Sequence, residues 1–309
     1  MRKFLIDTDT ASDDAIALMM ALREPTIQVE AITVVCGNLS VDQAVKNALN
    51  TIEAINTYAP PVYRGMHKPI MRPLFTSEYV HGSDGMGNMH LPAPTGKAED
   101  MHAIDAIIHH IMANPHELEV VTLGPMTNLA LAYLKEPRIA EYVKRVIVMG
   151  GQGLGPGNVT PVAEFNFYVD AEAVEIVLQS GMPLTFVGWD VSMDKTFIDE
   201  GDIERIAALQ TPLSDFTLSC TKVLQEHNLS QYGRRGFDLP DPTAMAVAIW
   251  PDMVRAEFET YGYMETKSEQ TYGQLIIDRF HVHQKPANVT ICQEIDADRF
   301  KQKLLELLS

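Results

Sequence analysis

Residues 4–15 read Phe-Leu-Ile-Asp-Thr-Asp-Thr-Ala-Ser-Asp-Asp-Ala and contain four aspartates within eight positions. A short apolar run ends at Asp7, and an apolar-periodic segment begins after Asp14, which predicts a buried strand, a tight loop and a helix start. Asp7 and Asp9 would lie at the carboxyl end of the strand, where open α/β sheets bind ligands. Asp13 and Asp14 would lie in the first helical turn, where the helix dipole favours negative charge.

Four carboxylates this close together would repel one another unless something neutralises them. A hard cation such as Ca²⁺ or Mg²⁺ would do so, because both ions prefer carboxylate oxygens. Aspartates before a helix often serve only as caps or in solvated turns. The strand that precedes these aspartates favours a metal site, because a buried strand would hold the carboxylates in fixed geometry.

Strand-like and helix-like runs alternate along the rest of the chain. The β-branched run 27–35 leads into Cys36-Gly37-Asn38, and Ser40 can cap the helix that follows. Further strands are predicted at 118–123, 145–149 and 184–187, each followed by glycine. Helices are predicted at 103–114, 171–180, most of 198–228 and 296–308, and another opens within 238–243 and continues through Trp250. This alternation predicts one α/β domain over residues 1–309, with an open, mostly parallel central sheet flanked by helices and joined by right-handed crossovers.

Three segments depart from this strand–helix alternation. Residues 59–100 are rich in Pro, Gly, Met and His and predict a long loop, in which His81 could line a site or be an ordinary loop histidine. Residues 231–236 predict a basic, flexible break, and residues 253–295 predict strands and hairpins. Asp241 follows the break at the start of a helix, where an aspartate can act as a cap.

Composition excludes several classes of protein. The 309 residues have a net charge of −17, which argues against nucleic acid or anionic membrane as a partner. The three cysteines are widely spaced and form no zinc pattern, so we expect reduced thiols in a cytoplasmic protein. The N-terminal apolar run is too short for a signal peptide, and no stretch has the length to span a membrane.

Polar side chains also follow the strand predicted at 145–149 and its glycines. Asn158, Glu164 and Asn166 stand in an otherwise apolar stretch, Gly157-Asn158-Val159-Thr160-Pro161-Val162-Ala163-Glu164-Phe165-Asn166. Amides and a carboxylate suit sugar hydroxyls, because each hydroxyl both donates and accepts a hydrogen bond. Taken alone, such residues would more often be solvated loop residues.

Two known patterns match the aspartate cluster. Phosphatases of the haloacid-dehalogenase type have Asp-x-Asp-x-Thr or Val, but Ala11 stands at the last position here. The string Asp7-x-Asp9-x-x-x-Asp13-Asp14 instead resembles the signature of the inosine-uridine-preferring nucleoside hydrolase family. Other pieces of that family's pattern follow in order: Gly37-Asn38, Leu123-Gly-Pro-Met-Thr-Asn128, Met149-Gly-Gly, Gly157-Asn158 with Ala163-Glu164-Phe165-Asn166, and Asp241-Pro242.

The resemblance implies the nucleoside hydrolase fold, which is Rossmann-like, with the site at the strand carboxyl ends. It implies Ca²⁺ bound by Asp9, Asp14, Asp241 and the backbone carbonyl of Leu123. The implied ribose-binding residues are Asp13, Asn38, Asn158, Glu164 and Asn166, with Met149 and Phe165 as an apolar floor and Asp7 as a support for the metal ligands.

The implied reaction is hydrolysis of the N-glycosidic bond of a small ribonucleoside, of the pyrimidine or inosine type. Calcium would lower the pKa of its bound water, Asp9 would accept the proton, and Glu164 would stabilise the positive charge that develops on the ribose. Relatives are commonly homodimers or homotetramers.

The sequence departs from the pattern at Pro240. Many members of the family have a histidine there, which donates a proton to the leaving base, and proline has no proton to give. His227, Tyr232 and Arg234 are nearby candidates for that role. Two alternatives stay open: a Mg²⁺-dependent phosphohydrolase with Asp7 as nucleophile, and a nucleoside-binding protein without catalytic activity.

Overall fold

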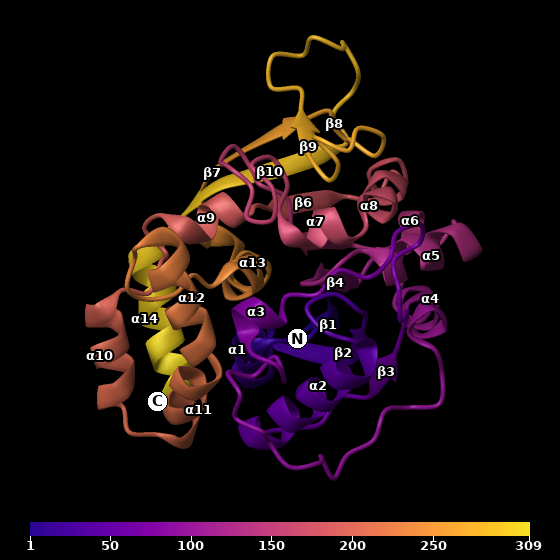
Figure 1. Ribbon diagram of the computed structural model, residues 1–309. Helices are drawn as coiled ribbons and strands as arrows, with labels where there is room; N and C mark the ends of the chain where they lie inside the picture. The colour runs from indigo at the N-terminus through magenta and orange to yellow at the C-terminus, as the bar shows by residue number, and fades with distance from the viewer.

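The first strand, β1, lies inside an eight-stranded sheet, as the computed structural model of residues 1–309 shows (Figure 1). The strand order is β3-β2-β1-β4-β5-β6-β10-β7, and all neighbours are parallel except β7, which runs antiparallel to β10. The predicted open, mostly parallel α/β sheet is therefore confirmed. Its strands are β1 (Arg2–Thr8), β2 (Ile27–Val34), β3 (Val62–Arg64), β4 (Leu118–Thr122), β5 (Arg145–Met149), β6 (Leu184–Val187), β7 (Val254–Thr260) and β10 (Val289–Ile295). A separate antiparallel pair is formed by β8 (Gly262–Met264) and β9 (Leu275–Ile277).

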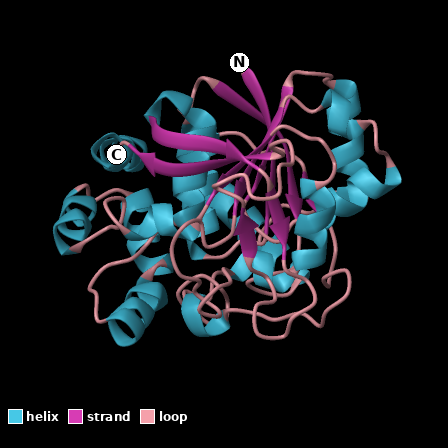
Figure 2. Cartoon of the chain, turned by 90° about the horizontal axis from the view of Figure 1, so that it is seen from above, coloured by secondary structure: helices cyan, strands magenta, loops and turns pink.

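Helices cover both faces of this sheet (Figure 2). One face packs against α1 (Ser12–Arg23), α2 (Val41–Ile55), α9 (Trp189–Met193) and α13 (Pro240–Ile249). An outer group of helices packs on α1 and on one another rather than on the sheet: α10 (Glu200–Ala208), α11 (Pro212–Cys220), α12 (Lys222–Tyr232) and α14 (Ala297–Leu308). The other face packs against α4 (Ala103–Ala113), α5 (Thr127–Lys135), α6 (Ile139–Tyr142) and α8 (Ala171–Leu178). The short helices α3 (Glu78–His81) and α7 (Phe165–Val169) and the 3₁₀ turn η1 (Pro251–Met253) complete the chain.

Alternate residues of β1 join the two cores. Phe4 and Ile6 belong to the core on one face and Leu5 to the core on the other, and all three are fully buried. Burying each such side chain contributes about 1.5–3 kcal/mol, so β1 is fixed firmly in the sheet. The residues that follow β1 therefore have a rigid support.

The connections between strands place the site. The chain moves from β1 outward through β2 to β3, and then returns to place β4 on the other side of β1. Ligands of open α/β sheets bind at such a reversal, beyond the carboxyl ends of the strands. The ends of β2, β1, β4 and β5 lie next to one another at this edge.

Helix α13 links this edge to the opposite one. Its first turn carries Asp241, and its last carbonyls accept hydrogen bonds at the other end of the sheet: Arg2 donates to Ala248 and Ile249, and Arg145 donates to Ala248. Arg2 and Arg145 both pair with Glu119 of β4.

The structure differs from the sequence predictions in three places. The predicted loop 59–100 contains β3 and α3, which are too short to produce a periodic pattern. The predicted break 231–236 begins later, because α12 continues to Tyr232 and ends at Gly233, which has a φ of 65°. Asp241 is not a cap: Leu239 occupies the N-cap position of α13.

Other details agree with the predictions. The Ser40 hydroxyl accepts a hydrogen bond from the backbone N–H of Gln43 at 3.4 Å and caps α2. Cys36, Cys220 and Cys292 are buried free thiols. None of the helices combines the length and the apolar character that crossing a bilayer requires.

Candidate active site

Three aspartates on two helices form the centre of the site. Asp13 and Asp14 lie in the first turn of α1, and Asp241 lies in the first turn of α13, which packs against α1. One carboxylate oxygen of each residue lies within 4.8 Å of those of the other two, and all three side chains are buried. The group contains Asp14 and Asp241, which the resemblance assigned to the metal, and also Asp13, which it assigned to ribose.

Asp9 follows β1 and is fully buried beside this group, although it is not one of the three grouped residues. Its Oδ2 accepts a hydrogen bond from the backbone N–H of Asn38 at 2.6 Å, whereas its Oδ1 has no partner. Asp7 is farther down the strand, and its Oδ1 accepts hydrogen bonds from Thr33 Oγ1 at 2.6 Å and Asn128 Nδ2 at 2.8 Å.

Two glycines predicted to mark strand ends leave room for Asp9. A Cβ at Gly37, after β2, would lie 2.1 Å from Asp9 Oδ2, and a Cβ at Gly124, after β4, would lie 2.6 Å from Asp9 Oδ1. Any larger residue at either position would displace the carboxylate. The glycines at these strand ends are therefore required by the close approach of a buried acid.

The four buried carboxylates of Asp9, Asp13, Asp14 and Asp241 repel one another when no cation is bound. Burial, with the charge of neighbouring carboxylates, raises the pKa of Asp13 to about 7 and that of Asp14 to about 6. Burial and the charge of Asp14 raise the pKa values of Asp9 and Asp241 well above the usual range. Asp9 Oδ1 and Asp13 Oδ1 are buried without hydrogen-bond partners. A divalent cation would neutralise this charge and satisfy such oxygens, so the residues present fit a metal site.

A pocket opens directly above this acidic group. It is lined by residues that the sequence analysis assigned to the site: Asp13, Asn38, His81, Leu123, Met149, Asn158, Glu164, Phe165, Asn166, His227, Tyr232 and Asp241. Asp7, Asp9 and Asp14 do not line the pocket and are buried below it. Arg234 is also absent from the lining, because its guanidinium lies 3.6 Å from the centre of the Phe197 ring and donates to the carbonyl of Met193. The structure therefore places Arg234 outside the pocket, away from the other two candidate proton donors.

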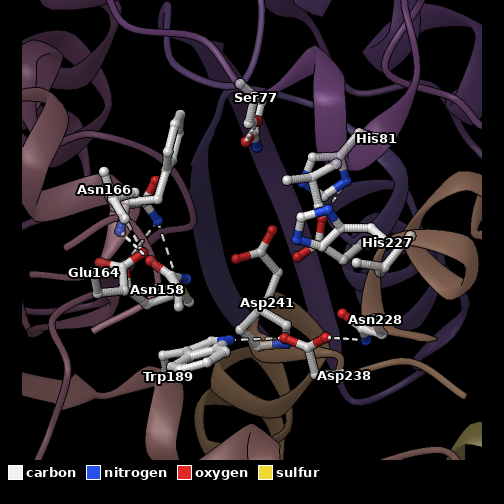
Figure 3. A pocket seen from close by; sticks show the side chains of 18 of the residues that line it. Ser77, His81, Asn158, Glu164, Asn166, Trp189, His227, Asn228, Asp238 and Asp241 are labelled. Carbon is white, nitrogen blue, oxygen red and sulfur yellow. Dashed lines mark hydrogen bonds and ion pairs between the residues drawn. The ribbon is translucent and has the colours of Figure 1, made fainter. Parts of the chain in front are cut away.

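One wall of the pocket carries amides and a carboxylate (Figure 3). Glu164 caps α7: its Oε1 accepts from the backbone N–H of Asn166, and its Oε2 accepts from that of Gly151 at 2.7 Å. Asn166 Nδ2 donates to the carbonyls of Leu123 at 2.6 Å and Met149 at 3.2 Å, so it ties together the ends of β4 and β5. Burial raises the pKa of Glu164 to about 7.

The side-chain amides of Asn38 and Asn158 are also fixed by hydrogen bonds within the protein. Asn158 Oδ1 accepts from the backbone N–H of Phe165 at 2.9 Å, which leaves its amide nitrogen free to donate. Asn38 Oδ1 accepts from the hydroxyl of Ser77, and its backbone N–H donates to Asp9. The wall thus presents fixed polar groups of the kind that bind sugar hydroxyls.

His81 is a fixed pocket residue rather than an ordinary loop histidine. It lies on α3, is buried, and its Nδ1 lies 2.7 Å from Ser12 Oγ. Burial lowers the pKa of His81 to about 4. His227 and Tyr232 line the same part of the pocket from α12, and burial lowers the pKa of His227 and raises the pKa of Tyr232 to about 12.

Several pocket residues were not identified from the sequence. They are Ser77 and Tyr79 in the segment before His81, Trp189 at the start of α9, Asn228 on α12, and Asp238 before α13. A signal existed for two of them: Trp189 directly follows a strand that ends at glycine, as Asn38 does, and Asp238 stands three positions before Asp241. The others lie on loop and helix positions without a distinguishing pattern.

Comparison with known proteins agrees with this geometry. Residues 4–302 match the sequence profile of the family described as inosine-uridine preferring nucleoside hydrolase. The pyrimidine-specific ribonucleoside hydrolase RihA of Shewanella sp. (strain MR-7) is 35% identical over 313 residues, covering 100% of this chain and 96% of the relative.

Two solved structures are also similar over nearly their whole length. A plant nucleoside hydrolase, the PpNRh1 enzyme, superposes with a TM-score of 0.93 at 28% identity, covering 99% of this chain and 98% of that one. A purine-preferring ribonucleoside hydrolase from Gardnerella vaginalis superposes with a TM-score of 0.92 at 28% identity, with the same coverage of both chains.

Proposed function

This chain belongs to the inosine-uridine preferring nucleoside hydrolase family, and from that premise we propose that it hydrolyses the N-glycosidic bond of ribonucleosides to a free base and ribose. The observation that carries the proposal is the buried group of Asp13, Asp14 and Asp241, which lies at one end of a pocket with a wall of amides and a carboxylate. Such a site can hold a cation and a polyhydroxylated sugar together.

We propose Ca²⁺ as the cation, held by Asp9, Asp14, Asp241 and the carbonyl of Leu123. The support is an all-oxygen donor set, since calcium takes six to eight oxygen ligands in flexible geometry. Asp13, which shares the acidic group, faces the pocket and would bind a ribose hydroxyl. When bound, the cation supplies Lewis acidity to an attacking water and coordinates neighbouring hydroxyl oxygens.

Asp9 would accept the proton of the attacking water at Oδ1. This oxygen has no hydrogen-bond partner, whereas Oδ2 is fixed by the Asn38 N–H. Burial of Asp9 also keeps water from solvating its carboxylate, which suits a base that takes a proton from one positioned water. Asp7, bonded to Thr33 and Asn128, would hold the strand end that carries Asp9.

The amide wall would bind ribose and stabilise its positive charge. Asn38, Asn158 and Asn166 offer groups to hydroxyls, with Met149 and Phe165 as an apolar floor. Glu164 would oppose the charge that develops on the sugar as the C–N bond breaks. A 2′-deoxyribonucleoside lacks one hydroxyl and would leave buried polar groups unpaired.

Tyr232 and His227 are the proposed donors to the leaving base, because both line the same pocket as Pro240. We propose pyrimidine nucleosides, inosine or both as substrates. The support is divided, since RihA is named as pyrimidine-specific and the Gardnerella enzyme as purine-preferring.

We also propose that the chain forms a homodimer or homotetramer, as its resemblance to the family implies. The exposed side chains of Phe280 and Val282, 86% and 76% accessible, suit burial against another copy. Light scattering coupled to gel filtration would give the mass directly, and a monomer at micromolar concentration would contradict the proposal.

A ribose assay tests the activity. We expect free ribose from uridine or inosine in the presence of CaCl₂, and a loss of at least about a hundredfold in kcat for Asp9→Asn. Far-ultraviolet circular dichroism of the variant would show that the fold is intact. Tight nucleoside binding by calorimetry with no ribose released would instead favour the binding-protein alternative.

The phosphohydrolase alternative is not supported. It requires an accessible nucleophile at Asp7, but that side chain is fully buried, bonded to Thr33 and Asn128, and absent from the pocket lining. The match to the nucleoside hydrolase profile covers residues 4–302 and points the same way.

A further inference from the structure

Aromatic side chains line the pocket from His227, which lies across from Asn158 and Glu164, round to Trp189 (Figure 3). Tyr79, His227, Tyr232 and Trp189 all line it. Their rings form a chain, with centroids 5.7 Å apart for Tyr79 and His227, 6.0 Å for His227 and Tyr232, and 6.0 Å for Tyr232 and Trp189. We call these four residues the aromatic wall. The faces of such rings attract a cation that lies within about 6 Å of their centres.

A carboxylate lies at the foot of the aromatic wall. Asp238 Oδ2 accepts a hydrogen bond from Trp189 Nε1 at 2.8 Å, and its Oδ1 accepts one from Asn228 Nδ2 at 2.8 Å (Figure 3). The residue is only 6% exposed, so these two donors fix the carboxylate. Each oxygen keeps a lone-pair direction for a ligand.

No cationic side chain of the pocket pairs with Asp238. No lysine or arginine is among the lining residues. Burial lowers the pKa of His227, which favours its neutral form at pH 7. A ligand with a positive aromatic ring would therefore meet aromatic side chains and a fixed carboxylate, and no lysine or arginine would oppose it. The proposed Ca²⁺ would be the one other cation, and its charge would be neutralised by Asp9, Asp14 and Asp241.

Pro240 adds a second reason to consider a positive base. When a neutral base leaves, the electron pair of the C–N bond goes to the ring nitrogen, and a proton must compensate that charge. Proline supplies none, so a neutral base would depend on Tyr232 or His227 for its proton. A base that is already cationic through its glycosidic nitrogen leaves as a neutral molecule and needs no proton.

We propose that the pocket takes ribonucleosides of the N-glycosyl pyridinium class, in which the base is a cationic aromatic ring, and hydrolyses them better than neutral nucleosides. This inference rests on the proposed N-glycosidic hydrolysis, because it uses the same ribose site. The C1′–N bond breaks and its electron pair neutralises the ring nitrogen. The water oxygen bonds to C1′, and its proton goes to Asp9 and then to solvent.

The first test compares kcat/KM for 3-carbamoylpyridinium riboside and for uridine, each divided by its uncatalysed hydrolysis rate. The wild-type protein should favour the pyridinium riboside. Asp238→Asn should lower kcat/KM for the pyridinium riboside about tenfold relative to uridine, because one charge next to the ring is removed. Asp252→Asn is the matched control: it removes an exposed carboxylate on η1, outside the pocket, and should leave the ratio unchanged.

A second pair of variants tests the aromatic wall without changing charge. Tyr232 is 39% exposed, so replacing it should not prevent folding. Tyr232→Phe keeps the ring, whereas Tyr232→Leu removes it, and KM for the pyridinium riboside should be about fivefold higher in the leucine variant than in the phenylalanine variant. Pro240→His should raise kcat for inosine relative to kcat for the pyridinium riboside.

The outcomes separate this inference from the proposed function. Ribose release from uridine or inosine with no preference for the pyridinium riboside would overturn the inference alone. An unchanged substrate ratio in Asp238→Asn, in a folded protein, would overturn it as well. No ribose from any of the three substrates would overturn the proposed function and the inference together.

Discussion

Replacing Glu119 by glutamine would test how firmly α13 is anchored at the sheet edge remote from the pocket. The Glu119 side chain is fully buried in β4 and accepts hydrogen bonds from Arg2 Nε at 2.9 Å, Lys144 Nζ at 3.0 Å and Arg145 Nε at 2.6 Å. Arg2 and Arg145 also hold the last carbonyls of α13. Loss of the charge at Glu119 would weaken the contacts among β1, β4 and β5 and the attachment of α13 to them.

The pKa of Glu119 gives the size of the effect. Burial alone would raise this pKa, but hydrogen bonds from Arg2 and the charge of Arg145 outweigh it and lower the pKa from 4.5 to about 2. One pKa unit corresponds to about 1.4 kcal/mol, so the ionised carboxylate contributes about 3 kcal/mol to the free energy of unfolding at pH 7. The pKa is lower in the folded state, so this contribution is complete above pH 4.5 and is lost as the pH falls toward 2. At pH 3.5 about 1.4 kcal/mol of it should be gone.

Urea unfolding followed by circular dichroism would measure this at pH 7 and at pH 3.5, on either side of the isoelectric point near 4.9. We expect Glu119→Gln to lower the free energy of unfolding by about 3 kcal/mol at pH 7 and by about half of that at pH 3.5. Glu294→Gln is the control, because the exposed pair of Glu294 and Lys195 should contribute less than about 1 kcal/mol. A loss below about 1 kcal/mol at pH 7, or an equal loss at both pH values, would refute the reasoning.

Three further predictions concern the site. Gly37→Ala would place a Cβ 2.1 Å from Asp9 Oδ2, so it should lower the free energy of unfolding by about 1–3 kcal/mol and abolish most of the ribose release. The control Gly201→Ala, where the nearest atom to the new Cβ is 3.4 Å away, should keep both stability and activity. Normal activity in Gly37→Ala would contradict the close approach of Asp9. Adding CaCl₂ to protein treated with chelator should raise the midpoint of thermal unfolding, because an ion that binds only the folded state stabilises it by about 2.7 kcal/mol at a hundred times its Kd. Asp241→Asn should reduce this rise. Equal midpoints with and without calcium in the wild-type protein would count against the metal site. The kcat/KM for 2′-deoxyuridine should be about 10–100-fold below that for uridine in the ribose-release assay, and equal values would show that the 2′-hydroxyl is not bound.

The sequence was most informative where one local pattern determined the structure. The run that ends at Asp7 predicted a central strand, and β1 lies between β2 and β4 with both faces buried. The glycines after the strands predicted close backbone approach, which Gly37 and Gly124 confirm around Asp9. Both predictions rest on patterns that a few neighbouring residues contain: an apolar run for the strand and a glycine directly after it for the close approach.

Contacts between distant segments could not be predicted in this way. Asp241 was assigned to the acidic group only through resemblance, because nothing local links it to Asp13 and Asp14. Trp189 and Asp238 were missed because their hydrogen bond joins the start of α9 to the loop before α13. The three residues of β3 were missed because so short a strand shows no alternation.

The anchoring of α13 constrains when the site can form during synthesis. Arg2 and the Ile249 carbonyl that it binds are separated by 247 positions, so the ribosome must make most of the chain before this contact exists. Until then, the aspartates after β1 have no partner from α13, and an ion would find only part of its ligands. Contacts over such distances in sequence form slowly, so cation capture should be among the last events of folding, and a nascent chain truncated before Asp241 should not retain calcium.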